Sequence, residues 1–170
     1  TSKISMAGAG ISAMAASSAN IADAKRHMAI QTIGPDKVNQ LRHVRFFKDL
    51  AGMKAHMQLH RALLKPKFDA IERVFTRELG GKGIATWTKP RGGYFVSLDT
   101  PDGCATEVVK LADAAGVKLT GAGATYPLQK DPADRNLRMA PSLPPAEQVE
   151  LAMEVVAVCV QLAALRVASR

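Results

Sequence analysis

The sequence predicts an α/β protein, on two patterns that change along its 170 residues. From Met53 to Phe75, apolar residues recur every three or four positions, which is the period of one face of a helix. After Gly83, the short runs 84–88 and 94–98 have the composition and turn boundaries of strands, and helical patterns follow them. Strands and helices mixed in one short region indicate a layer of helices packed on a sheet.

The sequence of the first 48 residues predicts a buried strand and turn followed by two helices. Residues 1–16 are rich in Gly and Ala, and we expect a buried strand and turn there. Residues 18–20 supply capping side chains for a helix that reaches about Thr32 and ends at Gly34-Pro35. A second helix should run from Pro35, a favoured first-turn residue, to about Lys48.

The apolar stripe from Met53 to Phe75 predicts one long helix, with Gly80 and Gly81 as its end. Pro66 falls inside this stripe. Proline has no amide hydrogen to donate and its ring crowds the carbonyl four residues earlier, so we expect a kink or a break near Lys65.

Beyond the long helix the pattern predicts strand, strand, helix, strand, strand, helix. The paired glycines of the 89–93 turn would join the first two strands. Gly116 would close the first of these helices. The expected strands are 84–88, 94–98, 117–120 and 137–140, and the expected helices run from about Val108 to Ala115 and from near Pro145 onward.

Composition excludes some classes of protein. Hydrophobic residues make up 47% and charged residues 22% of the chain, as in ordinary globular proteins. The sequence has no uncharged apolar run near 18 residues, so we expect no membrane span. The two cysteines, Cys104 and Cys159, lie in helical patterns and are expected to be free thiols of a reducing cytoplasm.

The formal charge of +8 is concentrated in residues 25–91, which hold 15 Lys/Arg against 5 Asp/Glu. These charges are spaced along the predicted helices, and few aromatic residues lie between them. A nucleic-acid footprint usually clusters its basic residues on one face. The pattern therefore favours solvated helix faces in a protein that handles anionic ligands, without nucleic acid as a partner.

Three motifs point to a more specific assignment. Thr1-Ser2-Lys3-Ile4 precedes a run of small residues at 7–12, and the turn Pro90-Arg91-Gly92-Gly93-Tyr94-Phe95 and the segment Asn136-Leu137-Arg138-Met139-Ala140-Pro141-Ser142 follow. A lysine beside hydroxyls, a Gly-Gly-aromatic turn and an arginine on a short apolar strand, in that order, resemble the C-terminal part of a pyridoxal-phosphate aminotransferase of fold type I. The branch that the chain resembles is aspartate aminotransferase-like or MocR-like.

The resemblance implies an organisation in three parts. Residues 1–48 would end the large cofactor-binding domain, 49–80 would form the helix that connects two domains, and 81–170 would form the small C-terminal α/β domain. Members of this family are much longer than 170 residues and build their site at the interface of a homodimer. We therefore expect the chain to be a fragment that is inactive by itself.

Lys3 is the predicted catalytic residue. The resemblance implies that its amine forms a Schiff base with pyridoxal phosphate and then moves a proton at the substrate Cα. Ser2 and Thr1 would bind the cofactor's phosphate through their hydroxyls. Where many relatives have a phosphate-binding arginine, this chain has Ile11. The backbone amides of Gly8-Ala9-Gly10, the missing part of the protein or a partner subunit would then have to balance that charge. The alternative is a solvated lysine without a role.

Arg138 is the predicted substrate-binding residue. A guanidinium binds a carboxylate through two parallel hydrogen bonds, and the resemblance places this role on Arg138 rather than Arg135. The flanking Leu137 and Met139 should point away from the site. The alternative for Arg138 is a surface ion pair. Tyr94 and Phe95, which follow the Gly92-Gly93 pair, could line the substrate pocket. The alternative for these two residues is a plain hairpin turn.

No metal site is predicted. His56 and His60 lie four residues apart, a spacing that can bind metal, but no third ligand is near in sequence, which favours packed histidines. The expected function is transfer of an amino group between an amino acid, with aspartate as first choice, and a 2-oxo acid such as 2-oxoglutarate. The alternatives are a carbon–sulfur β-lyase or another transaminase, the effector domain of a MocR-type regulator, and a homologue without cofactor.

Overall fold

The computed structural model describes residues 4–5 and 8–169. The chain forms two compact units, Thr1–Arg61 and Ala62–Arg170. The boundary lies inside one long helix, α3 (Leu50–Leu79), which contributes to both units. The division into 1–48, 49–80 and 81–170 stays a prediction.

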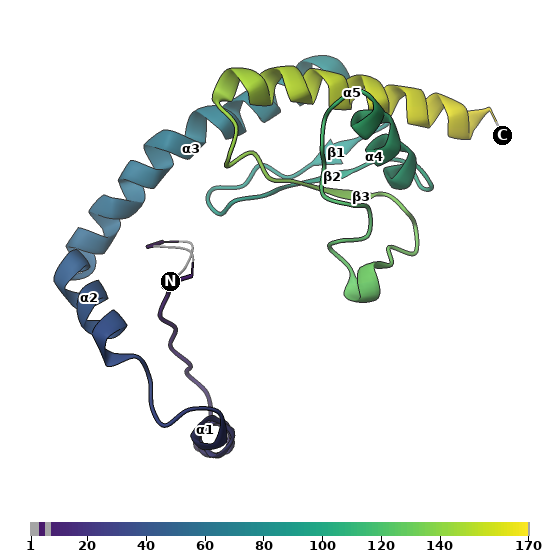
Figure 1. Cartoon of the computed structure of the whole chain (residues 1–170). Coiled ribbons are helices and arrows are strands. Elements are labelled where there is room, and N and C mark those ends of the chain that lie inside the picture. Colours follow the sequence, from purple (N-terminus) through teal and green to yellow (C-terminus); the bar gives the residue numbers. More distant parts are fainter. Residues whose placement is uncertain (1–3, 6–7, 170) are drawn as a thin grey trace. The chain divides into compact units, whose positions relative to one another are not determined.

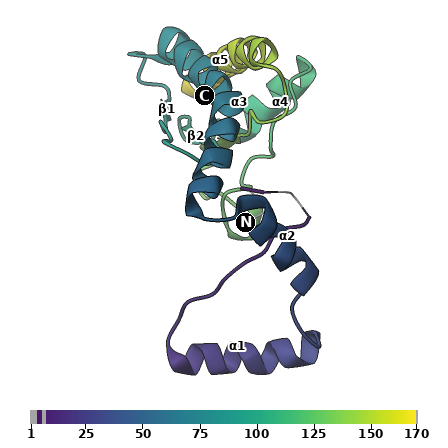
Figure 2. The ribbon, with the colours of Figure 1, turned by 90° about the vertical axis from the view of Figure 1, so that its left-hand side faces the viewer.

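The first unit holds α1 (Ser18–Gln31) and α2 (Lys37–Phe47), close to the predicted positions. The predicted start of α2 at Pro35 is wrong, since Asp36 is the cap and Pro35 precedes the helix. Both helices begin at a side-chain cap, because Ser17 Oγ accepts from the Asn20 amide at 3.3 Å and Asp36 Oδ1 accepts from the Asn39 amide at 2.9 Å. Figure 2 shows α1 lying away from α2 at the end of the 32–36 connection, and α1 has no buried residue.

Very little of the first unit is buried. Among its described residues only His43 and Phe47 are shielded from solvent. The expected buried strand within 1–16 is wrong for the residues that are described, since 8–16 are irregular and mostly exposed. A strand is stable only beside a partner strand, and the described part of this unit offers none.

The long helix is confirmed. Of the kink or break expected near Lys65, the break is wrong, because α3 continues from Leu50 to Leu79 with Pro66 inside it, and the kink stays a prediction. Proline removes one hydrogen bond, which destabilises a helix by about 3 kcal/mol. The second half of α3 is anchored by an apolar face buried in the core of the second unit. That face consists of Ala70, Ile71, Val74, Phe75 and Leu79.

The second unit is built on a three-stranded antiparallel sheet in the order β1-β2-β3 (Figure 1). The strands are β1 (Thr86–Trp87), β2 (Val96–Asp99) and β3 (Asn136–Met139), with Trp87 opposite Leu98 and Val96 opposite Met139. The helices α4 (Ala105–Ala114) and α5 (Ala146–Ala168) and the short 3-10 helix η1 (Pro127–Gln129) complete the unit.

One face of this sheet makes the core. Val96, Leu98, Leu137 and Met139 alternate along β2 and β3, are at most 2% exposed, and belong to the same buried cluster as residues of α3, α4 and α5. Figure 1 shows these helices on one side of the sheet. Because side chains alternate across a strand, the residues between them lie on the opposite face. The predicted fold class, helices packed on a sheet as in the small domain, is confirmed.

The strand predicted at 117–120 is absent. The Val117 amide donates to the Ala112 carbonyl at 2.8 Å and so completes the end of α4. Val117 and Leu119 pack against the core, but the 117–120 segment pairs with no strand in the described part of the chain. The apolar alternation is therefore explained by packing without a hydrogen-bonded ladder.

By length and composition α5 is apolar enough to cross a membrane. Seven of its residues, Val149, Met153, Val156, Ala157, Cys159, Val160 and Ala163, are buried in the core of the second unit instead. Other apolar residues of α5, namely Leu151, Val158, Leu162 and Leu165, are at least 42% exposed. Cys104 and Cys159 are both buried, and burial raises the pKa of the Cys159 thiol.

Candidate functional site

The candidate site lies on the face of the sheet that the helices do not cover. Arg138 occupies the middle of β3, opposite Ser97 of β2, while its neighbours Leu137 and Met139 point into the core at 1% and 2% exposure. This is the alternation that the sequence predicted. Arg138 therefore projects from a rigid, well-packed strand rather than from a loop.

The guanidinium of Arg138 is held by an aromatic ring. Its Cζ atom lies 4.5 Å from the centroid of the Phe95 ring, within the range of a cation–π contact. Phe95 is in the sequence-predicted turn segment and leads into β2, so the Gly-Gly-aromatic turn and the arginine strand are brought together. Within the described residues, the buried Nε of Arg138 has no hydrogen-bond acceptor and its guanidinium no carboxylate partner.

Arg135, the other arginine of this region, is already paired. Its guanidinium lies 3.7 Å from the Asp99 carboxylate and 3.8 Å from that of Asp102. Two carboxylates therefore balance its charge, whereas Arg138 keeps unused donors for an external anion. This difference favours Arg138 over Arg135 as a carboxylate-binding residue.

A small open pocket of about 130 Å³ adjoins Arg138. One wall is the 117–120 segment, including Lys118 and Thr120, and another is the chain from Arg138 to Pro141. Ile71 of α3 and Val149, Ala152 and Met153 of α5 complete the lining of this pocket.

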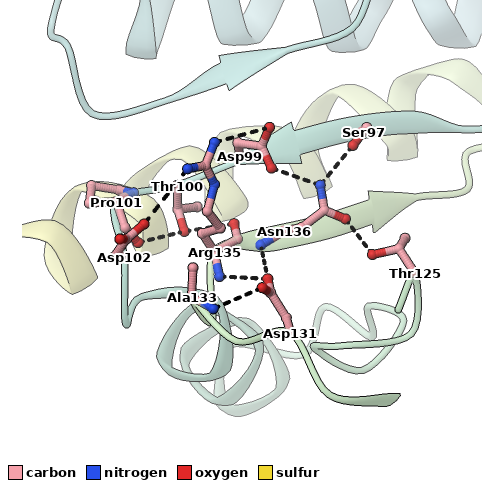
Figure 3. Close-up of polar contacts among 10 residues, drawn as sticks. All are labelled: Ser97, Asp99, Thr100, Pro101, Asp102, Thr125, Asp131, Ala133, Arg135 and Asn136. Atoms are coloured by element: carbon pink, nitrogen blue, oxygen red, sulfur yellow. Dashed lines mark hydrogen bonds and ion pairs between the residues drawn. The ribbon is translucent and has the colours of Figure 1, made fainter. Parts of the chain in front are cut away.

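Figure 3 shows a network of hydrogen bonds around Asn136, which belongs to the same strand as Arg138. The Asn136 side-chain amide donates to Ser97 Oγ and Asp99 Oδ1, both at 2.8 Å, and its oxygen accepts from Thr125 Oγ1 at 2.6 Å. Asn136 is 9% exposed. It lies two residues before Arg138 on the same face, and this period of two is the sequence signal by which its role could have been predicted.

Asp131 organises the turn that leads into β3. Its carboxylate accepts from the backbone amides of Asn136 and Arg135, each at 2.8 Å, and of Ala133 at 3.0 Å (Figure 3). Partial desolvation raises the pKa of the Asp131 carboxyl, but these three donors outweigh it, so the pKa lies below its ordinary value. The carboxylate is therefore a structural acceptor that holds the turn before β3.

Replacing Asn136 by leucine should destabilise the second unit by about 2–4 kcal/mol, because Ser97, Asp99 and Thr125 would lose a buried partner. Denaturant unfolding followed by the fluorescence of Trp87, the single tryptophan, measures this. Thr125→Val removes one of the three bonds and should cost only about 1 kcal/mol. Equal midpoints for the two variants would contradict a network centred on Asn136.

The remaining predicted site residues are placed less completely. Lys3, Ser2 and Thr1 lie outside the described residues. Ile11 is half-buried in the first unit, and Tyr94 is half-buried in the turn beside Phe95. Since Lys3 and Arg138 belong to different units, their proximity stays a prediction.

The rings of His56 and His60 pack against each other with centroids 4.5 Å apart, and His56 also lies edge-on to Phe46 and Phe47. The described residues contain no group of three potential metal ligands. This geometry is the packed arrangement of histidines that the sequence favoured.

Comparison with known proteins gives consistent matches. Over 164 residues the chain is 51% identical to an aspartate aminotransferase of Corynebacterium glutamicum, a match that covers 96% of this chain and 38% of that protein. The crystal structure of an aspartate transaminase from the same species superposes with a TM-score of 0.91 at 51% identity, again over 96% of this chain and 38% of the other.

A solved structure with lower sequence identity shares the fold. An α-aminoadipate aminotransferase from Thermus thermophilus, solved with N-(5'-phosphopyridoxyl)-L-leucine, has a TM-score of 0.60 at 19% identity and covers 75% of this chain and 31% of its own. At this identity the match concerns the fold alone. The chain thus spans about two fifths of the length of the two Corynebacterium glutamicum proteins that it matches.

The family model described as aspartate amino-transferase matches residues 1–170. The match spans the whole sequence, including the lysine segment and the arginine strand that first suggested the assignment. The chain belongs to the aspartate aminotransferase family.

Proposed function

We propose that the chain is the C-terminal part of a pyridoxal-phosphate-dependent aminotransferase that moves an amino group between aspartate and a 2-oxo acid. The family assignment and the 51% identity to an aspartate aminotransferase support this. The observation that carries the proposal within the structure is Arg138, an arginine on a rigid strand with a buried donor that nothing described accepts from. Such a donor set fits the carboxylate that every amino-acid substrate presents.

Arg138 would orient the substrate. Two parallel hydrogen bonds to the α-carboxylate define a plane, and Phe95 restricts the guanidinium from one side at 4.5 Å. Fixing the carboxylate in this way also fixes the direction of the Cα–H bond, which lowers the entropy that must be lost at the transition state.

Lys3 would hold the cofactor and move the proton. When bound, pyridoxal phosphate supplies an electron sink that acidifies the substrate Cα–H. An amine beside Cα can accept that proton and return it at another carbon, so the lysine acts as both base and acid. Ser2 and Thr1 would contribute hydroxyl donors to the phosphate. Because Ile11 stands where many relatives have a phosphate-binding arginine, another group would have to balance the charge of the phosphate.

The choice of aspartate rests on the relatives' names. A dicarboxylate substrate requires a second cation near its side chain, and the described residues give none that we can assign to it. The cation would come from the remaining length of the protein or from a partner subunit. We also propose that the protein is a homodimer and that its location is cytoplasmic.

A carbon–sulfur β-lyase is the closest alternative, and a two-step absorbance measurement separates it. In the full-length protein, aspartate should shift the absorbance of the bound cofactor, and 2-oxoglutarate should then restore it. A lyase would release its product without any 2-oxo acid. A MocR-type effector domain would bind without completing the cycle, and the names of the relatives favour the enzyme.

Expressed alone, residues 1–170 should bind pyridoxal phosphate weakly or not at all. The described residues of the first unit bury only two side chains, while Ile30, Ile33 and Val38 are at least 80% exposed. Exposed apolar groups of this kind mark surfaces that another part of the protein covers. Equilibrium dialysis and binding of a hydrophobic dye measure both properties. Tight binding and transamination by a monomer of 170 residues would contradict the proposal.

A further inference from the structure

One face of α2 is directed at the segment that follows Lys3. His43 and Asn39 lie four residues apart on this helix, so their side chains share a face. His43 Nε2 is 2.9 Å from Ser5 Oγ, and Asn39 Nδ2 donates to the carbonyls of Ala9 at 3.0 Å and Gly10 at 3.3 Å. All of these residues belong to the first unit.

The hydrogen bonds of His43 determine its tautomer. Its Nδ1 lies 2.8 Å from the Asn39 carbonyl oxygen, which can only accept, so Nδ1 carries the proton. In the neutral ring Nε2 is then an acceptor, and the Ser5 hydroxyl donates to it. His43 is 5% exposed, the only buried polar side chain in the described part of its unit. Burying a polar group costs free energy unless the group is hydrogen-bonded, and both ring nitrogens of His43 have a hydrogen-bond partner.

Asn39 is oriented just as firmly. Its Nδ2 faces two carbonyls, while its Oδ1 accepts from Arg42 Nη2 at 2.6 Å, so the amide cannot be reversed without losing these bonds. The segment it binds has Gly8, with φ of +77°, and Gly10, and these residues have no side chain to anchor them. Hydrogen bonds from α2 therefore restrict a stretch of backbone that packing alone would leave free.

We propose that His43 and Asn39 are positioning residues, which hold the backbone on the C-terminal side of Lys3 and thereby fix the amine of that lysine. The inference rests on the proposed role of Lys3. Ser5 is two residues from Lys3, so a shift of Ser5 moves the base of the lysine side chain. A misplacement of about 1 Å in a catalytic group can reduce a rate by about 100-fold. Neither residue is assigned contact with substrate or cofactor.

The test uses the full-length holoenzyme with three substitutions. His43→Leu removes both bonds of the ring, His43→Gln keeps an amide near the position of Nε2, and His56→Leu is the matched control. His56 is also packed among aromatic rings, but it has no described contact with residues 4–10. Hydrogen exchange of the peptide covering residues 4–11, the pH midpoint of the bound cofactor's absorbance, kcat and KM are measured for each.

For His43→Leu we expect faster exchange in residues 4–11, a shifted absorbance midpoint and a kcat lowered about 10- to 100-fold, with KM changed less than about 3-fold. His43→Gln should recover most of kcat, and His56→Leu should leave all four readouts near wild type. Unchanged exchange in His43→Leu overturns the inference. So does an equal loss in all three variants, since that reports folding alone. Hydrogen exchange is independent of the role of Lys3, so its result stands even if the proposed function fails.

Discussion

Replacing Lys3 by alanine in the full-length protein should abolish covalent attachment of the cofactor and lower transamination by about four orders of magnitude. The amine is the proposed attachment point and also the group that moves the substrate proton, and positioned acid–base groups contribute up to about 10⁴-fold. Loss of the absorbance band of the covalently bound cofactor, and of its trapping by borohydride, would be measured together with the rate.

The control for this substitution is Lys25→Ala, at an exposed position of α1, which should leave the spectrum and the rate unchanged. If the Lys3→Ala protein still trapped the cofactor with borohydride, another lysine would be the attachment point. The assignment of Ser2 and Thr1 to the phosphate would then fall as well, since it depends on the position of Lys3.

Arg138→Leu should lower kcat/KM by about 30- to 1000-fold while pyridoxal phosphate stays bound. A charge-assisted, two-bond contact to the substrate carboxylate contributes about 2–4 kcal/mol in the transition state. Arg138→Lys keeps the charge but not the planar pair of donors, so its kcat/KM should lie between wild type and Arg138→Leu. Steady-state kinetics with aspartate and 2-oxoglutarate, and the absorbance of the bound cofactor, measure the two effects separately.

Arg135→Leu is the natural comparison, because Arg135 is three residues away and already paired with Asp99 and Asp102. It should change kcat/KM by less than about 3-fold, since exposed ion pairs contribute at most about 1 kcal/mol. If Arg135→Leu had the larger effect on kcat/KM, the carboxylate-binding role would move to Arg135.

Local signals predicted most of the helices. Capping side chains, Gly34-Pro35 and Gly116 act within a few residues, and α1, α2 and α4 begin or end close to where these signals place them. Arg138 was predicted on a strand with its neighbours in the core, and the alternation of Leu137 and Met139 confirms that arrangement. These features depend on neighbouring residues and on the spacing of apolar side chains, and both can be read from a single sequence.

What could not be predicted depends on partners far away in the sequence. Val117 and Leu119 alternate like strand residues, but a strand needs a hydrogen-bonded neighbour, and here packing against the core takes its place. Pro66 signalled a break, but the buried second half of α3 holds the helix together. The bonds from Asn39 and His43 to the segment after Lys3 join residues about 30 to 40 positions apart, which no local pattern reports.

The pairing of β2 with β3 has a consequence for how the protein folds. The paired residues are about 40 positions apart, and all of α4 lies between them. Closing a loop of that length costs conformational entropy before any contact is gained, which slows folding. Arg138 lies on the later of these strands, so its place opposite Ser97 depends on the closure of this loop. Residues that never touch a substrate would then influence how fast the proposed carboxylate-binding arginine reaches its position.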